Sequence, residues 1–564
     1  MILLLNAGVL FPDRAAAQDF QWVKTMGAGT VDAALSVKTD GSGNCYTTGI
    51  FSATVDFDPG PGIYELTSAG NEDIFITKLD ASGNLVWARS IGGVNTDFGT
   101  SLSLDASGNV CITGNFSGTV DFDPGSGTCL ITSIGAINTY VCKLDAQGDF
   151  VWAKALGGSF QNSANSISID ASGDILVAGS FFETVDFDPG AGIHEETSVG
   201  GQDIFILKLD ASGNFIRVKT MGGTSDDFPL SIAIDAVANI YTCGAFQETC
   251  DFDPGTGISN LSSNGVEDVF ILKLDSAGNL IWVKGLGSES YDEAQSIATD
   301  PAGNLLVTGF FSLTVDFDPG PEVFNLSTPG DVHDYDIYIL KLDASGDFTW
   351  AKSIFAPNFN EGRSLTVDAS GKIYSTGTYQ GASDFDPGAG TFNLTPTGSE
   401  EMYLHILDAD GNFVWAGAMA GNSAGTSVTL DASGFVYTTG YFGEGSCDFD
   451  PGPGSFNVTA NGMTDIFTAK FSQVALGIKP ILRQDDVTLS PNPTGGIFTL
   501  SSPGNCGRFK LCNLTGEVIR EYDGRKLSQE GNLVINIRDL PDGIYLIQWD
   551  DGRKICNRKI VLQK

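Results

Sequence analysis

Short apolar runs separated by polar turns occupy most of the chain, and they recur with a fixed period. In the second period, four runs rich in β-branched and aromatic residues are Ser101–Asp105, Val110–Phe116, Tyr140–Asp145 and Phe150–Leu156. Runs of this length and composition predict β-strands. We therefore expect one repeat to consist of four short strands.

The segments between these runs predict tight turns. DASGN joins the first and second strands and DAQGD joins the third and fourth, and thirteen segments of this kind occur along the chain. Asp accepts hydrogen bonds from the backbone of such a turn, and Gly adopts the left-handed conformation without steric cost. The four strands are therefore expected to pair in order as an antiparallel sheet.

A second motif, DFDPG, marks one place in every repeat. It begins at Asp56, Asp121, Asp186, Asp251, Asp316, Asp384 and Asp448, with spacings of 65, 65, 65, 65, 68 and 64 residues. A period of this quality means that the chain is an array of one supersecondary unit. Four antiparallel strands per unit predict an all-β fold of the β-propeller type.

The two ends of the array predict how the propeller closes. The run Phe20–Gly27 aligns with fourth strands, whereas the last run, Asp465–Phe471, aligns with third strands. We predict a seven-bladed propeller over residues 19–476, in which strands from both termini complete one blade. Trp recurs at one fourth-strand position, where it is expected to pack blade against blade. The residues are Trp22, Trp87, Trp152, Trp282, Trp350 and Trp415, with Arg217 in the seventh repeat.

The run DIFITKLDASGNLVWARSIGG at residues 73–93, followed by SLSLDASGNVCITGNF at residues 101–116, resembles the bacterial β-propeller repeats called SBBP repeats. The resemblance covers about residues 19–476. It implies the propeller fold, and it implies no particular biochemical activity, because the family is defined by its fold.

Three interpretations of DFDPG compete. In the structural one, Phe is buried and the aspartates cap the turn that Pro-Gly enforces. In the second, the aspartates supply oxygen ligands for Ca²⁺, although D-x-D lacks the fuller pattern of a calcium loop. In the third, the motif's face binds an external partner. The candidate calcium ligands are Asp56, Asp58, Asp121, Asp123, Asp186, Asp188, Asp251, Asp253, Asp316, Asp318, Asp384, Asp386, Asp448 and Asp450.

A polar ring precedes the first strands. Because successive strands alternate in direction, we expect the ring and the DFDPG motifs on one face of the propeller, opposite the DASGN turns. Its members are Asp32, Asp97, Asn162, Asp227, Asp292, Asn360 and Ser423. Capping of the turn between blades is their expected role. Beside them lie five aromatic residues: Phe98, Phe160, Phe228, Tyr291 and Phe359. Aromatic rings beside polar groups suit sugar or peptide binding, and they equally suit closing the mouth of the ring.

The charge of the chain is −39, and it is unevenly distributed. Residues 479–564 carry 13 basic and 10 acidic side chains, which leaves 17 basic and 59 acidic residues before them. A surface this negative argues against nucleic-acid binding. The three histidines, His194, His333 and His405, fall in different blades, and no motif of a hydrolase or a phosphate-binding loop occurs. We therefore expect no enzyme activity.

The C-terminal segment has a different pattern. Balanced charge and alternating apolar runs predict a β-sandwich over residues 487–564, joined through a linker at 477–486. The motif P-N-P-T-G-G at 491–496, L-x-x-G-x-Y at Leu540–Tyr545 and the terminal K-I-V-L-Q-K resemble the type A sorting domain of the type IX secretion system. The resemblance implies contact with that secretion machinery, export across the outer membrane, and often anchoring at the cell surface.

The two remaining sequence features concern the N-terminus and the cysteines. The apolar run Ile2–Phe11, followed by Ala15–Ala17, predicts a signal peptide over residues 1–18, in which the usual basic start is missing. No later run is long enough for a membrane-spanning helix. Most of the ten cysteines are expected to be buried free thiols, with one disulfide conceivable among Cys506, Cys512 and Cys556.

Together these patterns predict a secreted or surface-displayed propeller that acts as a non-enzymatic binding or adhesion module for a glycan or protein. A purely architectural surface protein is the alternative, and a polysaccharide hydrolase or lyase is a third. Calcium is the one cofactor that the sequence suggests.

Overall fold

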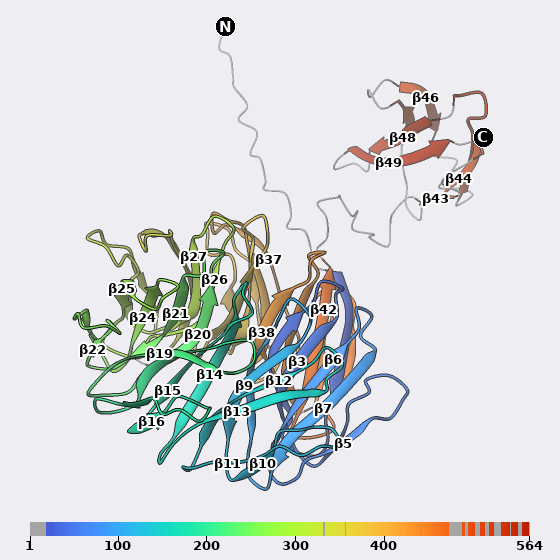
Figure 1. The fold of residues 1–564 in the computed structure, drawn as a ribbon. Coiled ribbons are helices and arrows are strands. Elements are labelled where there is room, and N and C mark those ends of the chain that lie inside the picture. Colours follow the sequence, from blue (N-terminus) through green and yellow to red (C-terminus); the bar gives the residue numbers. More distant parts are fainter. Residues whose placement is uncertain are drawn as a thin grey trace. The chain divides into compact units, whose positions relative to one another are not determined.

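The computed structural model describes residues 19–330, 333–355, 357–443, 445–472, 488–490, 495–501, 508–513, 518–523, 532–541, 543–550, 555–562 and 564. The predicted signal peptide and linker lie outside these residues. The chain divides into two compact units, Met1–Ala475 and Leu476–Lys564. Every regular element among the described residues is a β-strand (Figure 1).

Each repeat of the first unit has a four-stranded antiparallel sheet, which in the first three repeats is extended to six strands by a hairpin of the next repeat. The first strands are β2 (Ala33–Thr39), β8 (Phe98–Leu104), β14 (Asn162–Ile169), β20 (Asp227–Ile234), β26 (Glu293–Thr299), β32 (Glu361–Val367) and β38 (Ser423–Leu430). The second strands are β3 (Cys45–Phe51), β9 (Val110–Phe116), β15 (Ile175–Phe181), β21 (Ile240–Phe246), β27 (Leu305–Phe311), β33 (Ile373–Tyr379) and β39 (Val436–Gly443).

The outer half of each sheet holds the third and fourth strands. The third strands are β6 (Asp73–Leu79), β12 (Asn138–Leu144), β18 (Asp203–Leu209), β24 (Asp268–Leu274), β30 (Asp336–Leu342), β36 (Glu401–Leu407) and β42 (Thr464–Ser472). The fourth strands are β7 (Leu85–Gly93), β13 (Phe150–Gly158), β19 (Phe215–Gly223), β25 (Leu280–Leu286), β31 (Phe348–Ile354), β37 (Phe413–Ala418) and, from the N-terminus, β1 (Asp19–Met26).

The four strands predicted in the second repeat are all present. The observed β8 begins earlier than predicted, at Phe98, because a bulge between Gly99 and Ser101 lets the preceding residues stay paired with β9. Such a bulge also occurs in the first strands of the other repeats.

The last repeat is completed by the N-terminal strand, as the sequence predicted. β1 pairs antiparallel with β42, from Phe20 opposite Phe471 to Met26 opposite Ile466. Each first strand contacts the first strand of the next repeat, and β38 of the last repeat contacts β2 of the first. In Figure 1 the orange strand β42 accordingly lies beside the blue strands of the first repeat. The array therefore returns to its own beginning.

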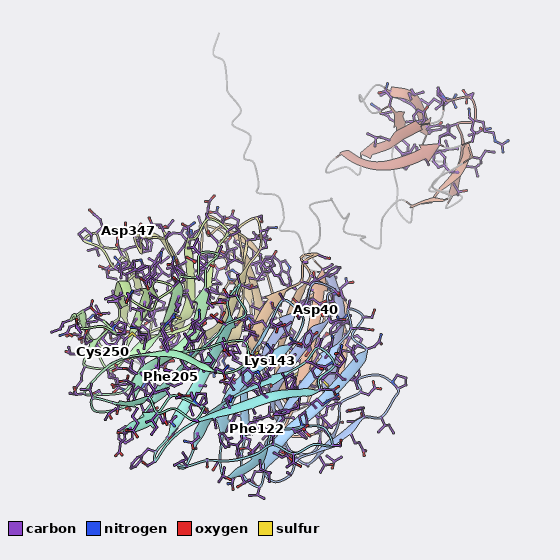
Figure 2. The ribbon with its side chains drawn as sticks, in the orientation of Figure 1. Asp40, Phe122, Lys143, Phe205, Cys250 and Asp347 are labelled. Carbon is purple, nitrogen blue, oxygen red and sulfur yellow. The ribbon has the colours of Figure 1, made fainter. Side chains whose placement is uncertain are left out.

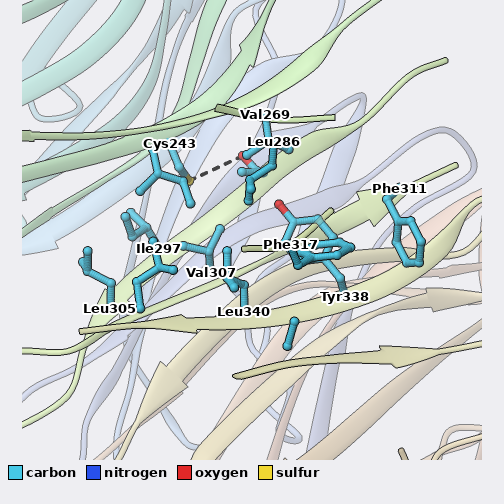
Figure 3. Close-up of a cluster of buried hydrophobic side chains, with 14 of the residues drawn as sticks. Cys243, Val269, Leu286, Ile297, Leu305, Val307, Phe311, Phe317, Tyr338 and Leu340 are labelled. Atoms are coloured by element: carbon cyan, nitrogen blue, oxygen red, sulfur yellow. Dashed lines mark hydrogen bonds between the residues drawn. The ribbon is translucent and has the colours of Figure 1, made fainter. Parts of the chain in front are cut away.

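The core of this unit lies between neighbouring sheets. The cluster in Figure 3 joins Cys243 and Val269 of one repeat to Val307, Phe317 and Tyr338 of the next. A smaller cluster packs Tyr437 of the last repeat against Val37 and Leu79 of the first. Each sheet is apolar on both faces because each is covered by a neighbour on both sides.

The predicted Trp positions do connect neighbouring repeats. A Cβ added to Gly148 would lie 2.8 Å from the Trp87 ring, so the turn of the second repeat closes directly on the Trp of the first. The indole Nε1 of Trp87 donates to the Ala146 carbonyl at 3.2 Å. Gly83, Gly213, Gly346 and Gly411 face the equivalent Trp side chains. In these turns the left-handed position is usually glycine. The turn at residues 235–239 is an exception, because Ala238 occupies that position with φ 66°.

The second unit consists of two sheets around one apolar core. One sheet has the order β43-β44-β47, and the other has the order β46-β45-β48-β49. The strands are β43 (Thr488–Ser490), β44 (Ile497–Ser501), β45 (Arg508–Cys512), β46 (Val518–Asp523), β47 (Asn532–Asn536), β48 (Gly543–Asp550) and β49 (Ile555–Leu562). Phe498 and Ile535 of the first sheet pack with Phe509, Ile547 and Ile560 of the second.

The cysteines follow the sequence prediction where they are described. Cys45, Cys111, Cys142, Cys243, Cys250, Cys447 and Cys512 are buried free thiols, and Cys129 is a half-buried one. The prediction of a disulfide is therefore wrong for any pair that includes Cys512. The pairing of Cys506 with Cys556 rests on a residue and a side chain outside the described part of the chain.

Candidate functional site

Each DFDPG motif begins at the end of the first strand of a small hairpin. The hairpins are β4/β5 (Thr54–Asp56, Glu65–Thr67), β10/β11 (Thr119–Asp121, Leu130–Thr132), β16/β17 (Thr184–Asp186, Glu195–Thr197), β22/β23 (Thr249–Asp251, Asn260–Ser262), β28/β29 (Thr314–Asp316, Asn325–Ser327), β34/β35 (Ser383–Asp384, Asn393–Leu394) and β40/β41 (Ser446–Asp448, Asn457–Thr459).

The carboxylates of the motif hold its loop together. In the first repeat, Asp56 Oδ1 accepts hydrogen bonds from the backbone N–H of Asp58 at 3.0 Å and of Tyr64 at 2.8 Å. Asp58 Oδ1 accepts from the N–H of Gly60 at 2.8 Å. The same three bonds occur in the other six repeats.

The Phe of the motif is buried in every repeat. Phe122, labelled in Figure 2, has no exposed surface and packs on Phe116 and Tyr140 with ring centroids 5.3 and 5.0 Å apart. The members are Phe57, Phe122, Phe187, Phe252, Phe317, Phe385 and Phe449. The geometry of the loop thus has the capped turn and buried ring of the structural interpretation.

The fourteen aspartates proposed as calcium ligands are these turn caps. Among the described residues, no group of three or more His, Cys, Asp or Glu side chains has the arrangement of a metal site. One oxygen of each aspartate is held by backbone N–H groups, so any calcium would rely on the second oxygens and on backbone carbonyls. Calcium binding stays a prediction.

The hairpins also connect the repeats. β10 of the second repeat pairs with β7 of the first, with Val120 opposite Gly93 and Asp121 opposite Gly92. β16 pairs with β13, and β22 pairs with β19, in the same way. A Cβ on Gly93 would lie 2.4 Å from the Thr119 carbonyl oxygen, so this close approach requires glycine. The hairpin therefore covers the end of an edge strand that would otherwise be open.

The predicted polar ring is buried and caps the connections between repeats. Asp97 Oδ2 accepts from the N–H of Gly93 at 2.8 Å, and its Oδ1 accepts from Ser117 at 3.0 Å. Burial raises the pKa of Asp97 to about 6. All seven positions of the ring are at most 1% exposed. They are consequently structural and are not available to a ligand.

A second ring of buried acids, which was not predicted from the sequence, faces the first. Asp73, at the start of β6, accepts from Ala69 N–H at 2.7 Å through Oδ2, while its buried Oδ1 has no hydrogen-bond partner. Burial, and then the nearby Asp97, raise the pKa of Asp73 to about 7. Asp203 and Asp268 hold the same position, with pKa values raised by burial to about 7.

A signal for this pairing was present in the sequence. Asp73 lies 24 residues before Asp97, and the same interval separates Asp203 from Asp227 and Asp268 from Asp292. Where the first ring carries Asn162, the residue 24 positions earlier is Asn138 instead of Asp. Asn360 of the first ring has Asp336 at the same interval, so the spacing recurs while the residue types at the two positions vary.

The five predicted ligand-face aromatics have different environments. Phe98, Phe160 and Tyr291 are 36%, 44% and 41% exposed, and Phe228 and Phe359 are half-buried. Phe160 contacts Phe182 at 5.5 Å between ring centroids. In the described chain, no ring contact joins two of the five, so they do not form one aromatic cluster.

Phe98 instead lines a cavity of about 480 Å³. Its lining comes from three consecutive repeats and consists of Asn71, Asn95, Thr96, Phe98, Asn115, Ser117, Ile137, Gln161 and Ser163. Amides and hydroxyls predominate, and no charged side chain takes part. Of these residues, only Phe98 was predicted from the sequence to face a ligand.

Two of the equivalent positions three repeats later are acidic, Glu293 and Glu361. Glu293 occupies the place of Phe98, and burial together with Glu267 and Glu361 raises the pKa of its carboxyl to about 7. Gln295 Nε2 donates to Glu293 Oε2 at 2.7 Å, and Arg363 Nε lies 2.6 Å from Glu361 Oε2. The first unit therefore presents a neutral pocket and an acidic sector at the same level of the repeat.

Comparison with known proteins separates the two units. Residues 488–563 match the family model of the secretion system C-terminal sorting domain. The chain is 23% identical over 476 residues to an uncharacterized WD repeat-containing protein of Acanthamoeba polyphaga mimivirus, covering 70% of this chain and 34% of that protein. It is 26% identical over 186 residues to the regulatory protein FlaEY of Caulobacter vibrioides, covering 33% and 19%. The chain thus spans about a third or less of either relative.

Among solved structures, the WD40 domain of Pan2 from Neurospora crassa is similar, with a TM-score of 0.35, 9% identity, and coverage of 77% of this chain and 88% of that one. Its own strand topology and the match of residues 488–563 make this an all-β, propeller-like repeat protein with a C-terminal sorting domain, and that domain implies export to the cell surface or the medium. Within the described residues, no helix has the length and apolar character needed to cross a membrane.

Proposed function

We propose that the first unit is a closed seven-bladed propeller of the SBBP type. The proposal is supported by the circular order of first-strand contacts, which runs from β2 through β38 and back to β2. It is also supported by the Lys470 ammonium, which donates to the Ala81 carbonyl at 2.9 Å, just as third-strand lysines elsewhere reach the turn of the next repeat.

The propeller functions at the cell surface or in the medium as a non-enzymatic binding module. The observation that carries this proposal is the neutral cavity at Phe98, because it is built from positions that differ among the repeats. At the position of Asn115, the other repeats carry Ile50, Ser180, Ala245, Phe310, Thr378 and Tyr441. A scaffold alone would not require a pocket with this neutral, amide-rich lining.

Binding is tested with the purified full-length chain immobilised against a panel of extracellular polysaccharides and proteins. We expect saturable binding to at least one member and no turnover of any polysaccharide. If nothing in the panel binds saturably, the architectural alternative replaces the binding function. Release of reducing ends or unsaturated products would instead identify an enzyme.

The route of export has its own test. Deletion of residues 487–564 should leave the propeller folded and abolish surface display, so that the protein accumulates in the periplasm. Substitution of Lys564→Ala is a milder change than the deletion. It removes one hydrogen bond within the sorting unit, which the Lys564 ammonium donates to the Leu540 carbonyl. Normal surface levels of the truncated protein would contradict the proposed role of the sorting domain.

A further inference from the structure

We propose that the cavity at Phe98 binds an uncharged saccharide. This inference rests on the proposed binding function and assigns the chemical class of the ligand. Its basis is the set of polar groups in the lining, the position of one aromatic ring, and the absence of charge.

Several lining groups have hydrogen-bonding capacity that the fold leaves unused. Asn115 Oδ1 accepts from the N–H of Ala164 in the next repeat at 3.0 Å, which fixes the amide so that its NH₂ group is the free end. The side chains of Asn71, Gln161 and Ser163 have no hydrogen-bond partner among the described residues. Amides that offer donors and acceptors together match the paired hydroxyl groups of a sugar ring.

The aromatic ring stands directly beside these groups. Phe98 pairs with Asn115 across β8 and β9, so both side chains project from the same face of the sheet. The Phe98 carbonyl is held by the Tyr140 hydroxyl at 3.1 Å, which fixes the backbone under the ring. A partly exposed ring next to fixed amides provides an apolar surface for the C–H face of a sugar and polar groups for its edge.

Charge selects against acidic sugars. The lining contains no charged side chain, and Glu72, the acid adjoining it, accepts a hydrogen bond from Thr96 Oγ1 at 2.6 Å. No cation is present to pair with a uronate or a sulfate, and the chain as a whole carries −39. Desolvating an anion in this pocket without a partner would be unfavourable.

The test uses the full-length chain on an array of neutral oligosaccharides (gluco-, manno- and N-acetylglucosamine-based) and of acidic ones (polygalacturonate and sulfated glycans), followed by titration calorimetry. We expect binding to at least one neutral class. Asn115→Ala and Gln161→Ala should each weaken it about tenfold, as expected for losing hydrogen bonds to a ligand. Gln161→Ala is expected to fold normally, because this exposed side chain has no hydrogen-bond partner among the described residues. A loss of affinity in this variant therefore reports on the ligand contact.

Matched controls come from the equivalent positions of later repeats. Ser180→Ala, at the place of Asn115, and Phe228→Ala, at the place of Phe98, should leave affinity unchanged. A preference for acidic glycans would overturn the saccharide site. So would an affinity of Asn115→Ala and Gln161→Ala for the neutral glycan that equals the affinity of the natural protein. Binding of a protein that these two substitutions abolish would also overturn it, while leaving the proposed binding function in place. Absence of any binding would remove both.

Discussion

The DFDPG hairpins and the positions that line the cavity at Phe98 occur in the same repeats. They differ in how strictly the residue type is kept from one repeat to the next. Every first aspartate of DFDPG accepts the same two backbone N–H groups, at 2.7–3.1 Å. The position of Asn115, by contrast, carries a different residue in every repeat. Hydrogen bonds to the backbone are required wherever the chain turns in the same way, whereas a ligand needs only one pocket.

This difference predicts that repeated positions control stability and variable positions control binding. The repeated set includes the DFDPG aspartates and phenylalanines and the strand that closes the array. The variable set includes Phe98, Asn115 and Gln161. Four experiments separate the two sets, beginning with the largest expected effect.

The closing strand should have the largest effect. Deletion of residues 20–27 removes the neighbour that pairs with one side of β42 from Ile466 to Phe471 and leaves an open edge strand. We expect aggregation or a loss of several kcal/mol in the free energy of unfolding, measured by denaturant titration. Unchanged melting and solubility would mean that the array does not close through β1.

Two phenylalanines of one repeat make the next comparison. Phe122→Ala should cost about 3 kcal/mol, because the ring is fully buried against Phe116 and Tyr140. Phe98→Ala should change the free energy of unfolding by less than about 1 kcal/mol, because that ring is partly exposed. Equal losses in the two variants would contradict the division between structural and ligand-facing positions.

Stability should decrease from about pH 4 to pH 7. The pKa of Asp73, Asp203 and Asp268 is raised in the folded protein to about 7, so the folded state binds more protons than the unfolded state across this interval. Their favourable contribution is complete below the unfolded pKa of Asp and is lost as pH rises through 7. The turn aspartates act in the opposite direction, since hydrogen bonds lower the pKa of Asp80 and Asp105, and their contribution is lost only in stronger acid.

Thermal melting at pH 4.5 and pH 7.5 measures this effect. Asp73→Asn should raise stability at pH 7.5 by about 1–2 kcal/mol and change it little at pH 4.5, because the amide cannot ionise. The repeat with Asn138 and Asn162 already contains the neutral pair. A pH-independent difference between the variant and the natural protein would show that ionisation of this site is not involved.

The smallest effect is expected from the aspartates of one DFDPG motif. Asp121→Asn with Asp123→Asn retains an oxygen for each backbone N–H, so the loss should stay within about 1 kcal/mol. Melting in calcium and in chelator tests the metal interpretation, since a bound ion stabilises the folded state by mass action. A strong calcium-dependent rise in the natural protein that disappears when all seven pairs are changed would establish the metal interpretation.

Local rules made much of the fold predictable from the sequence. The alternation of apolar runs with Asp/Gly turns predicted four strands per repeat, because strand pairing and turn capping depend on residues close in the chain. The mismatch between the first and last runs likewise predicted the pairing of β1 with β42. The burial of the DFDPG phenylalanine, one of three interpretations, also followed from its alternation with aspartate.

Contacts between repeats were decided only by the tertiary structure. The sequence did not reveal that Asp73 faces Asp97, that β10 pairs with β7, or that Asn71, Asn115 and Gln161 line one cavity. These groups come together because neighbouring sheets pack face to face, and the packing sets their separation independently of their distance along the chain. The period in the sequence determines which strands and turns each sheet contains. The way adjacent sheets pack determines which of their side chains meet.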